Sequence, residues 1–378
     1  MPIEFIGYVT GRHQSETIPP VGPAVDPGYI ATTAAIHENA GFDRVLVAFH
    51  SNSPDSLLIA HHAAAATRRL GLLIAHRPGF AAPTLAARQL ATLDQLTRGR
   101  VAVHIIAGGN DSELEADGDH TTKAVRYARA SEYLDVLRRE WSAGAAFDHE
   151  GAFYRVAGAR SDVGPYRPGG IPIYFGGASE DAVQVAGRHA DAYALWGETY
   201  DEVAAMIARV SAAAAANGRP APRFSLSFRP IVADSETQAW ERADQVRARI
   251  DALQHGAGVQ AGAIALDVAG ASPAAGTLST NEGSRRLRAL AARGERLDKR
   301  LWTGVAAATG GRWNSTALVG DPDQVAEALL DYYRLGVTTF LIRGFDPLAD
   351  ALVYGRDLIP RVRALVAQED ARRGIAAA

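Results

Sequence analysis

The sequence predicts an α/β protein, a (β/α)8 TIM barrel formed as one domain by residues 1–378. Three observations favour this fold. Short apolar runs alternate with helix-length amphipathic stretches, about 30 residues from one run to the next, as in a barrel. No G-x-G-x-x-G follows the first apolar run, which disfavours a doubly wound nucleotide-binding sheet. Polar and aromatic side chains recur where the apolar runs end, which is where barrel enzymes carry their active sites.

The strands and helices follow one another in a regular order. The eight predicted strands are residues 3–9, 44–49, 72–75, 101–106, 171–175, 192–196, 224–232 and 338–342. The predicted helices cover residues 29–40, 55–70, 83–98, 123–141, 199–217, 237–253, 322–335 and 348–366, and one more opens at 178–181. Helix boundaries carry the expected residues: Pro83 suits a first turn, Gly99 a helix end, and Thr199 a cap.

Three insertions interrupt this rhythm. Residues 111–122 form a polar loop, and residues 145–170, rich in Gly, Pro and aromatic residues, predict a small hairpin. Residues 255–315 form a long Gly/Ala-rich region, for which a mobile lid is a better interpretation than a second domain.

The composition excludes several classes of protein. With 39 Lys and Arg against 42 Asp and Glu, the net charge of −3 gives no basic excess for nucleic acid or an anionic membrane. The chain has no cysteine, so disulfides, thiolate catalysis and zinc–thiolate sites are absent. The first residues, MPIEFIGYVTGRHQ, lack the charged start and long apolar core expected of a signal peptide, and no apolar run has the length expected of a membrane span. We therefore expect a soluble, cytoplasmic protein.

Residues 171–182, IPIYFGGASEDA, predict a buried strand, a tight turn and a helix N-terminus. Glycines at 176 and 177 would let a ligand approach the backbone closely, and the first N–H groups of the helix suit a phosphate. The same pattern also fits an ordinary strand–helix turn, which is common in α/β proteins. Alone, therefore, it does not decide between the two interpretations.

His50, His76 and His104 lie at or near the ends of three successive predicted strands. A metal site is one interpretation, but no His-x-His follows the first strand and no Asp or Lys ends a late one, so no metal is expected. Proton transfer by His50 or His76 and cofactor contact are the functional alternatives. For each of the three histidines, a purely structural role as a hydrogen-bonded residue at the barrel rim explains the sequence equally well.

Trp196, at another strand end, could line a pocket for a planar ring or plug the barrel. Arg229 and Arg343 lie near strand ends where they could hold an anionic substrate, with Arg229 in a catalytic role. Strand alternation would send Ser227 and Arg229 to the same side. Alternatively, Arg229 pairs with a carboxylate such as Glu198 and closes the barrel rim.

Five segments together resemble the bacterial luciferase-like flavin monooxygenases, most closely the two-component alkanesulfonate monooxygenases. They are RPGFAAPTLAARQLATLDQLTRGR (77–100), RYARASEYL (126–134), PIYFGGASEDA (172–182), LWGE (195–198) and TALVGDPDQVAEAL (316–329). The resemblance covers nearly the whole chain in one order. It implies a barrel with a lid, reduced FMN supplied by a separate NAD(P)H:flavin reductase, molecular oxygen as co-substrate, and a homodimer or homotetramer.

The resemblance also implies site residues. Tyr127 matches a tyrosine near the flavin phosphate, and the turn Gly177, Ala178 and Ser179 matches the phosphate-holding turn. His104 stands where the family often has an Asn at the polar edge of the flavin ring, and Trp196 matches the pocket tryptophan. The positions of the substrate pocket depart from the family pattern: they carry Ser53, Ser227, Arg229, Arg312, Arg343 and Phe345.

The leading hypothesis is a monooxygenase that oxidises a small anionic compound, such as an alkanesulfonate, through a peroxyflavin. The alternatives are a non-sulfonate substrate and a deazaflavin-dependent oxidoreductase of the same superfamily. A non-catalytic flavin-binding protein is the alternative outside enzymes.

Overall fold

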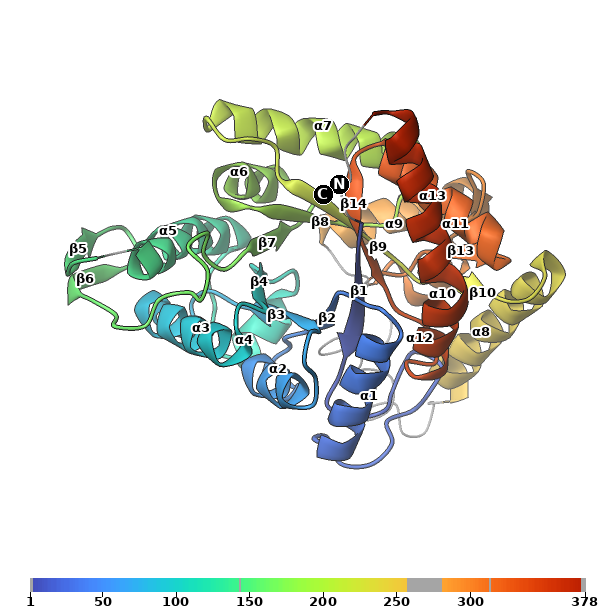
Figure 1. The fold of residues 1–378 in the computed structure, drawn as a ribbon, viewed down its shortest axis with the longest axis horizontal. Coiled ribbons are helices and arrows are strands. Elements are labelled where there is room, and N and C mark those ends of the chain that lie inside the picture. Colours follow the sequence, from blue (N-terminus) through green and yellow to red (C-terminus); the bar gives the residue numbers. More distant parts are fainter. Residues whose placement is uncertain (1–2, 143, 257–280, 313, 375–378) are drawn as a thin grey trace.

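Eight parallel strands close into a barrel, and helices surround it (Figure 1). The computed structural model describes residues 3–142, 144–256, 281–312 and 314–374. The barrel strands are β1 (Glu4–Val9), β2 (Arg44–Val47), β3 (Gly71–His76), β4 (Val101–Ile105), β7 (Ile173–Gly176), β8 (Ala192–Trp196), β9 (Arg223–Phe228) and β14 (Val337–Ile342). Their order around the barrel is β1-β14-β9-β8-β7-β4-β3-β2, and every neighbouring pair is parallel. The predicted (β/α)8 barrel is confirmed.

Helices cover the outside of the barrel. They are α1 (Pro27–Asn39), α2 (Ser56–Ala65), α3 (Pro83–Thr97), α5 (Lys123–Ser142), α6 (Glu180–His189), α7 (Tyr200–Ala216), α8 (Glu236–Gly256) and α11 (Pro322–Arg334), followed by α12 (Ala349–Val353), a π-helical turn (Tyr354–Leu358) and α13 (Ile359–Arg372). Local sequence explains several ends. Pro83 opens α3, while Arg98 and Gly99 end it with positive φ angles of 56° and 83°. Asp321 and Gln324 form a reciprocal capping box at the start of α11.

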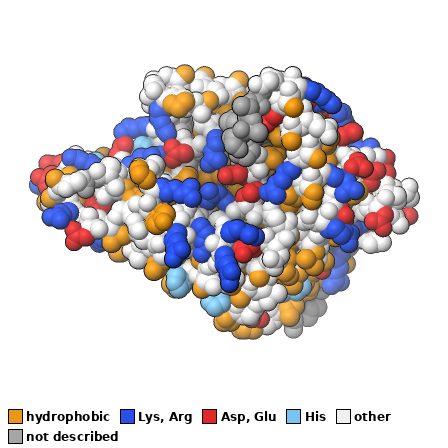
Figure 2. Space-filling model, in the orientation of Figure 1, with side chains coloured by type: hydrophobic (Ala, Val, Ile, Leu, Met, Phe, Trp, Pro, Cys, Tyr) orange, Lys and Arg blue, Asp and Glu red, His pale blue; other side chains and the backbone are white. Residues whose placement is uncertain are grey.

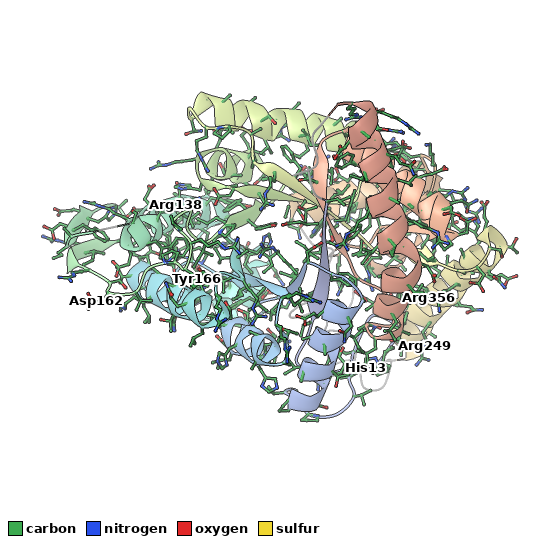
Figure 3. The ribbon with its side chains drawn as sticks, viewed as in Figure 1. His13, Arg138, Asp162, Tyr166, Arg249 and Arg356 are labelled. Atoms are coloured by element: carbon green, nitrogen blue, oxygen red, sulfur yellow. The ribbon has the colours of Figure 1, made fainter. Side chains whose placement is uncertain are left out.

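Two small sheets stand outside the barrel. The hairpin of β5 (Phe147–Glu150) and β6 (Arg155–Ala159) lies within residues 145–170 and projects beyond the end of α5 (Figure 1). The second sheet has the order β10 (Ile231–Val232), β13 (Ala317–Gly320), β12 (Leu301–Trp302) and β11 (Arg296–Leu297). Asp162 and Tyr166, which follow β6, lie on the opposite side of the molecule from Arg249 and Arg356 (Figure 3). At both ends of the face in view, acidic and basic side chains are interspersed (Figure 2).

The alternation of side chains along the barrel strands builds two layers of core. A large cluster fills the space between strands and helices. A smaller cluster of inward-facing residues fills the barrel interior: Ile6, Leu73, Ala102, Tyr174 and Ala192. Leu46 and Leu341 pack against this inner cluster and also line the cavity above it. The filled interior therefore forms the floor of the functional site.

The prediction for the seventh strand, residues 224–232, is wrong at its C-terminal end. β9 stops at Phe228, and Ile231–Val232 forms β10, which pairs with β13 in the second sheet. Pro230 has no backbone N–H to donate to a barrel neighbour, and the N–H of Arg229 donates to the Thr316 carbonyl at 3.0 Å. Residues beyond 228 have therefore left the barrel wall.

The insertions also differ from a simple loop description. The predicted polar loop 111–122 contains a short helix, α4 (Asp111–Ala116). Of the predicted lid, residues 257–280 and 313 lie outside the described residues. Residues 255–256 end α8, and the other described residues of that range include α9 (Glu282–Arg293), β11, β12 and α10 (Gly304–Thr309). The mobility of the range stays a prediction. Among the described helices, none is both long enough and apolar enough to cross a membrane.

Candidate functional site

A cavity of about 630 Å³ lies at the C-terminal ends of the barrel strands. Strand-end residues line it on several sides, including His104 on β4, Gly176 on β7 and Trp196 on β8. Helices α4 and α9 contribute the upper wall through residues such as Glu113 and Gly283. Its volume lies within the range of sites for small molecules and cofactors. No group of three or more His, Asp or Glu side chains within the described ranges is arranged to hold a metal ion.

The turn from β7 to α6 forms a cradle on one side of the cavity. Gly177 has a φ of 136°, and a Cβ at this position would stand 2.8 Å from the Ala182 Cβ and 3.1 Å from the Tyr127 hydroxyl oxygen. Only glycine fits such a backbone without strain. Ser179 caps α6, accepting a hydrogen bond from the Ala182 N–H at 3.4 Å. Gly177 and Ala178 line the cavity, so the start of α6 is directed toward it.

Two side chains of α5 complete this cradle. Burial raises the pKa of Tyr127 above its ordinary value, so its hydroxyl is protonated and can donate a hydrogen bond. Lys123, one helical turn earlier on the same face, lines the cavity with its ammonium 5.9 Å from the centre of the Tyr127 ring. The sequence interpretation missed Lys123, although its four-residue spacing from Tyr127 could have revealed it. A cation, a hydroxyl and a helix N-terminus at a glycine turn fit a phosphate group.

His104 supplies a polar contact across the cavity floor. Burial lowers its pKa to about 4, so the imidazole is neutral at pH 7. Its Nδ1 is buried and has no hydrogen-bond partner among the described residues. A neutral imidazole offers one donor and one acceptor, which suits the polar edge of a flavin ring. The orphaned nitrogen and the Gly177 cradle together fit the phosphorylated flavin that the sequence resemblance implies.

Trp196 lines the cavity and forms a contact with α9. A Cβ at Gly283 would stand 2.8 Å from the Trp196 indole, so only a glycine allows this approach of helix to ring. Arg286 of α9 donates two hydrogen bonds to Glu198, from its Nε at 2.7 Å and from its Nη2. Because Glu198 is buried at 7% exposure, this charge-assisted pair ties α9 to the end of β8.

His50 lies at the cavity wall beside a buried ion pair. Arg77 donates to the Glu113 Oε1 at 2.7 Å, and the His50 Nδ1 lies 3.7 Å from the same oxygen. Burial alone would raise the pKa of Glu113, but His50 and Arg77 lower it to about 2. The carboxylate is therefore charged and fixes both neighbours. Ser53 does not line the cavity, because its hydroxyl bonds the backbone N–H and carbonyl of His50 at 3.0 Å.

The structure places Arg229 away from the cavity, contrary to the sequence-based expectation. Its side chain is 1% exposed and donates two parallel hydrogen bonds of 2.7 Å to Glu16 and one of 3.0 Å to the Gly344 carbonyl. Its guanidinium lies 4.0 Å from the centre of the Phe345 ring, which is itself buried and not part of the cavity lining. The alternation argument fails because β9 ends at Phe228. The alternative of a structural ion pair is nearer the observed contacts, with Glu16 as partner instead of Glu198.

Some of the other predicted site residues line the cavity and some do not. His76 is half-buried, with its Nε2 2.7 Å from the Tyr133 hydroxyl, and it does not line the cavity. Desolvation by the surrounding protein lowers its pKa to about 4, so it is neutral near pH 7 and serves as a hydrogen-bond partner of Tyr133. Ser227, Arg312 and Arg343 do line the cavity, whereas Ser179 stands behind it as the cap of α6.

Comparisons with known proteins identify the family and support the fold. A family model described as Luciferase-like monooxygenase matches residues 3–339. Among similar solved structures is the EDTA monooxygenase EmoA from Chelativorans sp. BNC1, with a TM-score of 0.75, 20% identity, and coverage of 97% of this chain and 94% of that one. Riboflavin lyase (RcaE), solved with modified FMN and riboflavin, has a TM-score of 0.74 and 20% identity over 100% of this chain and 93% of that chain. DmoA from Hyphomicrobium sulfonivorans has a TM-score of 0.72 and 20% identity, with coverage of 100% of this chain and 89% of that chain. At these identities the solved structures support the fold.

Proposed function

The chain belongs to the luciferase-like monooxygenase family, an FMN-dependent class of oxidoreductases, and from that premise we propose that it is the oxygenase of a two-component system. A separate NAD(P)H:flavin reductase would supply reduced FMN, and molecular oxygen would be the co-substrate. The substrate is a small, anionic organic compound, and oxidative desulfonation of an alkanesulfonate is the leading reaction.

One observation carries the proposal: the phosphate cradle beside a cavity large enough for a flavin. Gly177 opens the backbone, Tyr127 offers a hydroxyl donor, and Lys123 places a cation on the same side. The carboxylate that opens α6, Glu180, is directed to Arg209 at 2.9 Å on the protein surface. It therefore does not compete for the N–H groups at the start of the helix.

The protein residues would bind and orient the cofactor and keep water away. Reduced FMN, when bound, supplies electrons and activates oxygen. His104 would hold the polar edge of the ring, and Trp196 would lie against a ring or substrate surface under α9. The Arg286–Glu198 pair holds α9 over this side of the cavity, which favours exclusion of water. His50 is the lining residue that could exchange protons with a bound molecule.

An anaerobic titration tests the cofactor assignment. Reduced FMN should bind more tightly than reduced riboflavin, because each charge-assisted hydrogen bond to the phosphate contributes about 1.5–3 kcal/mol. Lys123→Met should reduce the ratio of the two affinities, FMN over riboflavin, about tenfold or more. Lys299→Met should leave this ratio unchanged, since Lys299 is 56% exposed and pairs with Asp331. Equal affinities for FMN and riboflavin would refute the phosphate cradle. A reduced deazaflavin cofactor that binds more tightly than FMN would favour the deazaflavin alternative.

Turnover tests the substrate class separately. The protein, a flavin reductase, NADH and oxygen would be incubated with a panel of alkanesulfonates, carboxylates and neutral alcohols. Release of sulfite from a sulfonate supports desulfonation, and oxidation of another compound alone supports the non-sulfonate alternative. Tight binding of reduced FMN with no product from any compound supports a non-catalytic flavin-binding protein.

A further inference from the structure

Behind the cavity wall, the side chains of Glu16, Arg229 and Arg343 form a cluster with a net charge of +1. Glu16 accepts two hydrogen bonds of 2.7 Å from Arg229 and a third, of 2.6 Å, from the Arg343 Nη2. Two guanidinium groups therefore share one carboxylate, whose pKa they lower to about 2 against the raising effect of burial. Of the three residues only Arg343 lines the cavity. The cluster thus presents one excess positive charge to bound molecules through Arg343.

Arg343 lines the cavity beyond its bond to Glu16. Its side chain is 12% exposed, and its guanidinium carbon lies 4.9 Å from the centre of the ring of Tyr8, another lining residue. Within the described ranges, the bond to Glu16 is the single hydrogen bond recorded for this guanidinium. A guanidinium carries five N–H donors, so donors remain for a ligand.

A hydroxyl donor stands beside this cation. Asn314 donates from its Nδ2 to the Ser227 Oγ at 2.5 Å, and both residues are buried and line the cavity. Because the Ser227 oxygen accepts this bond, its own hydrogen is left to donate elsewhere. The Asn314 Oδ1, also buried, has no partner in the part of the chain that the structure describes. The pair therefore fixes a serine donor at the cavity wall.

The strand register brings these groups together. Ser227 of β9 is the register partner of Leu341 on β14, Arg343 follows directly after the end of β14, and both Ser227 and Arg343 line the cavity. The Arg343 N–H also donates to the Phe228 carbonyl at 3.4 Å, which keeps the two chains adjacent at this point. Neighbouring strands are about 4.8 Å apart, so one head group can reach both side chains. The phosphate cradle follows β7, and β8 separates it from this wall.

We propose that the β9–β14 wall is a subsite for a monoanionic oxyanion head group, a sulfonate or a carboxylate, bound by Arg343 and Ser227. Arg229 and Glu16 are positioning residues that fix Arg343 from behind, and Asn314 positions the Ser227 hydroxyl. One excess positive charge matches one negative charge, so the subsite disfavours a phosphate dianion, which would leave a charge uncompensated in a buried site. This inference rests on the proposed function, because it concerns the substrate of that cavity.

Calorimetric titration of the protein loaded anaerobically with reduced FMN tests the subsite. The probes are hexane-1-sulfonate, hexanoate, hexyl phosphate and 1-hexanol at pH 8, which share one alkyl chain. At least one of the two monoanions should bind about tenfold or more tightly than hexanol and than hexyl phosphate. The tighter binder of the two, hexane-1-sulfonate or hexanoate, then shows whether the subsite prefers a sulfonate or a carboxylate head group.

Two variants assign the binding to named residues. Arg343→Met should weaken monoanion binding about tenfold or more while leaving hexanol and reduced FMN binding unchanged. It leaves Glu16 paired one to one with Arg229, so the buried charges stay balanced and the chain should fold. Ser227→Ala retains every charge and should weaken monoanion binding by a smaller factor, about threefold. Arg285→Met is the matched control, because Arg285 is 69% exposed on α9 and pairs with Glu282.

The outcomes separate this inference from the proposed function. Failure of reduced FMN to bind overturns the proposed function, and the subsite that depends on it. Binding of reduced FMN without preference for either monoanion, or without any binding of the two monoanions, overturns the subsite alone. The same conclusion follows if Arg343→Met binds the monoanions as tightly as the parent protein does.

Discussion

The buried cluster of Glu16, Arg229 and Arg343 predicts a large stability effect for Glu16→Gln. The substitution keeps the shape of the side chain but leaves two guanidinium groups, 1% and 12% exposed, without a counter-charge. Breaking a buried ion pair in this way costs about 3–5 kcal/mol. The unfolding entropy of about 2.1 cal/mol/K per residue gives about 0.8 kcal/mol/K for a chain of 378 residues, so Tm should fall by about 4–6 °C.

Urea unfolding followed by circular dichroism measures this loss, and a double variant tests its cause. Glu16→Gln/Arg229→Met removes one of the uncompensated charges and fills the space with an apolar chain, so it should regain part of the lost stability. The pKa of Glu16 is lowered to about 2, so its contribution is fully present above the unfolded pKa, near 4.5. It is lost as the pH falls from about 4.5 to about 2. The difference between parent and Glu16→Gln should therefore be equal at pH 6 and pH 8.

Two results would refute this reasoning. One is a Glu16→Gln protein within about 0.5 kcal/mol of the parent, the range of ordinary surface substitutions. The other is a loss of unfolding free energy in the double variant that equals the sum of the losses in Glu16→Gln and in Arg229→Met measured alone. Effects at independent sites add, whereas effects at coupled sites do not.

Three further predictions concern other parts of the chain. The pKa values of His76 and His104 are lowered by burial to about 4, so the unfolded chain takes up protons at a higher pH than the folded chain does. The free energy of unfolding should therefore be unaffected above about pH 6.5 and fall toward pH 4, by up to about 3 kcal/mol for each histidine. A urea midpoint that does not change between pH 7 and pH 5 would contradict this prediction. Gly283→Val should displace α9, because even its Cβ would stand 2.8 Å from the Trp196 ring, and trypsin should then cut α9 faster than in the parent; equal cleavage rates would argue against the contact. Asp321→Ala should cost about 1 kcal/mol in urea unfolding through loss of the capping box of α11, whereas Asp321→Asn should cost less, and no difference between the two would exclude capping as the cause.

The sequence by itself determined the barrel and the place of its site. Apolar runs of strand length recur between amphipathic stretches, and such a pattern depends only on which side chains must be buried along each element. The turn after residue 175 was recognisable for the same reason, since glycine at 177 is required by the local backbone, which has a φ of 136°. Tyr127 and Trp196 were also identified, through the family resemblance, as residues of the cavity that they line.

Only the tertiary structure decided which charged side chains face the cavity. Arg229 and Arg343 both follow barrel strands, but Glu16, 213 residues from Arg229 in sequence, binds the first wholly and the second in part. Asn314 joins the cavity because the segment before β13 packs beside it, which no local pattern encodes. Burial and charge pairing depend on contacts between distant segments, whereas strand and helix periodicity is written in neighbouring residues. The fold was therefore predictable from the sequence, and the distribution of charge in the site required the three-dimensional structure.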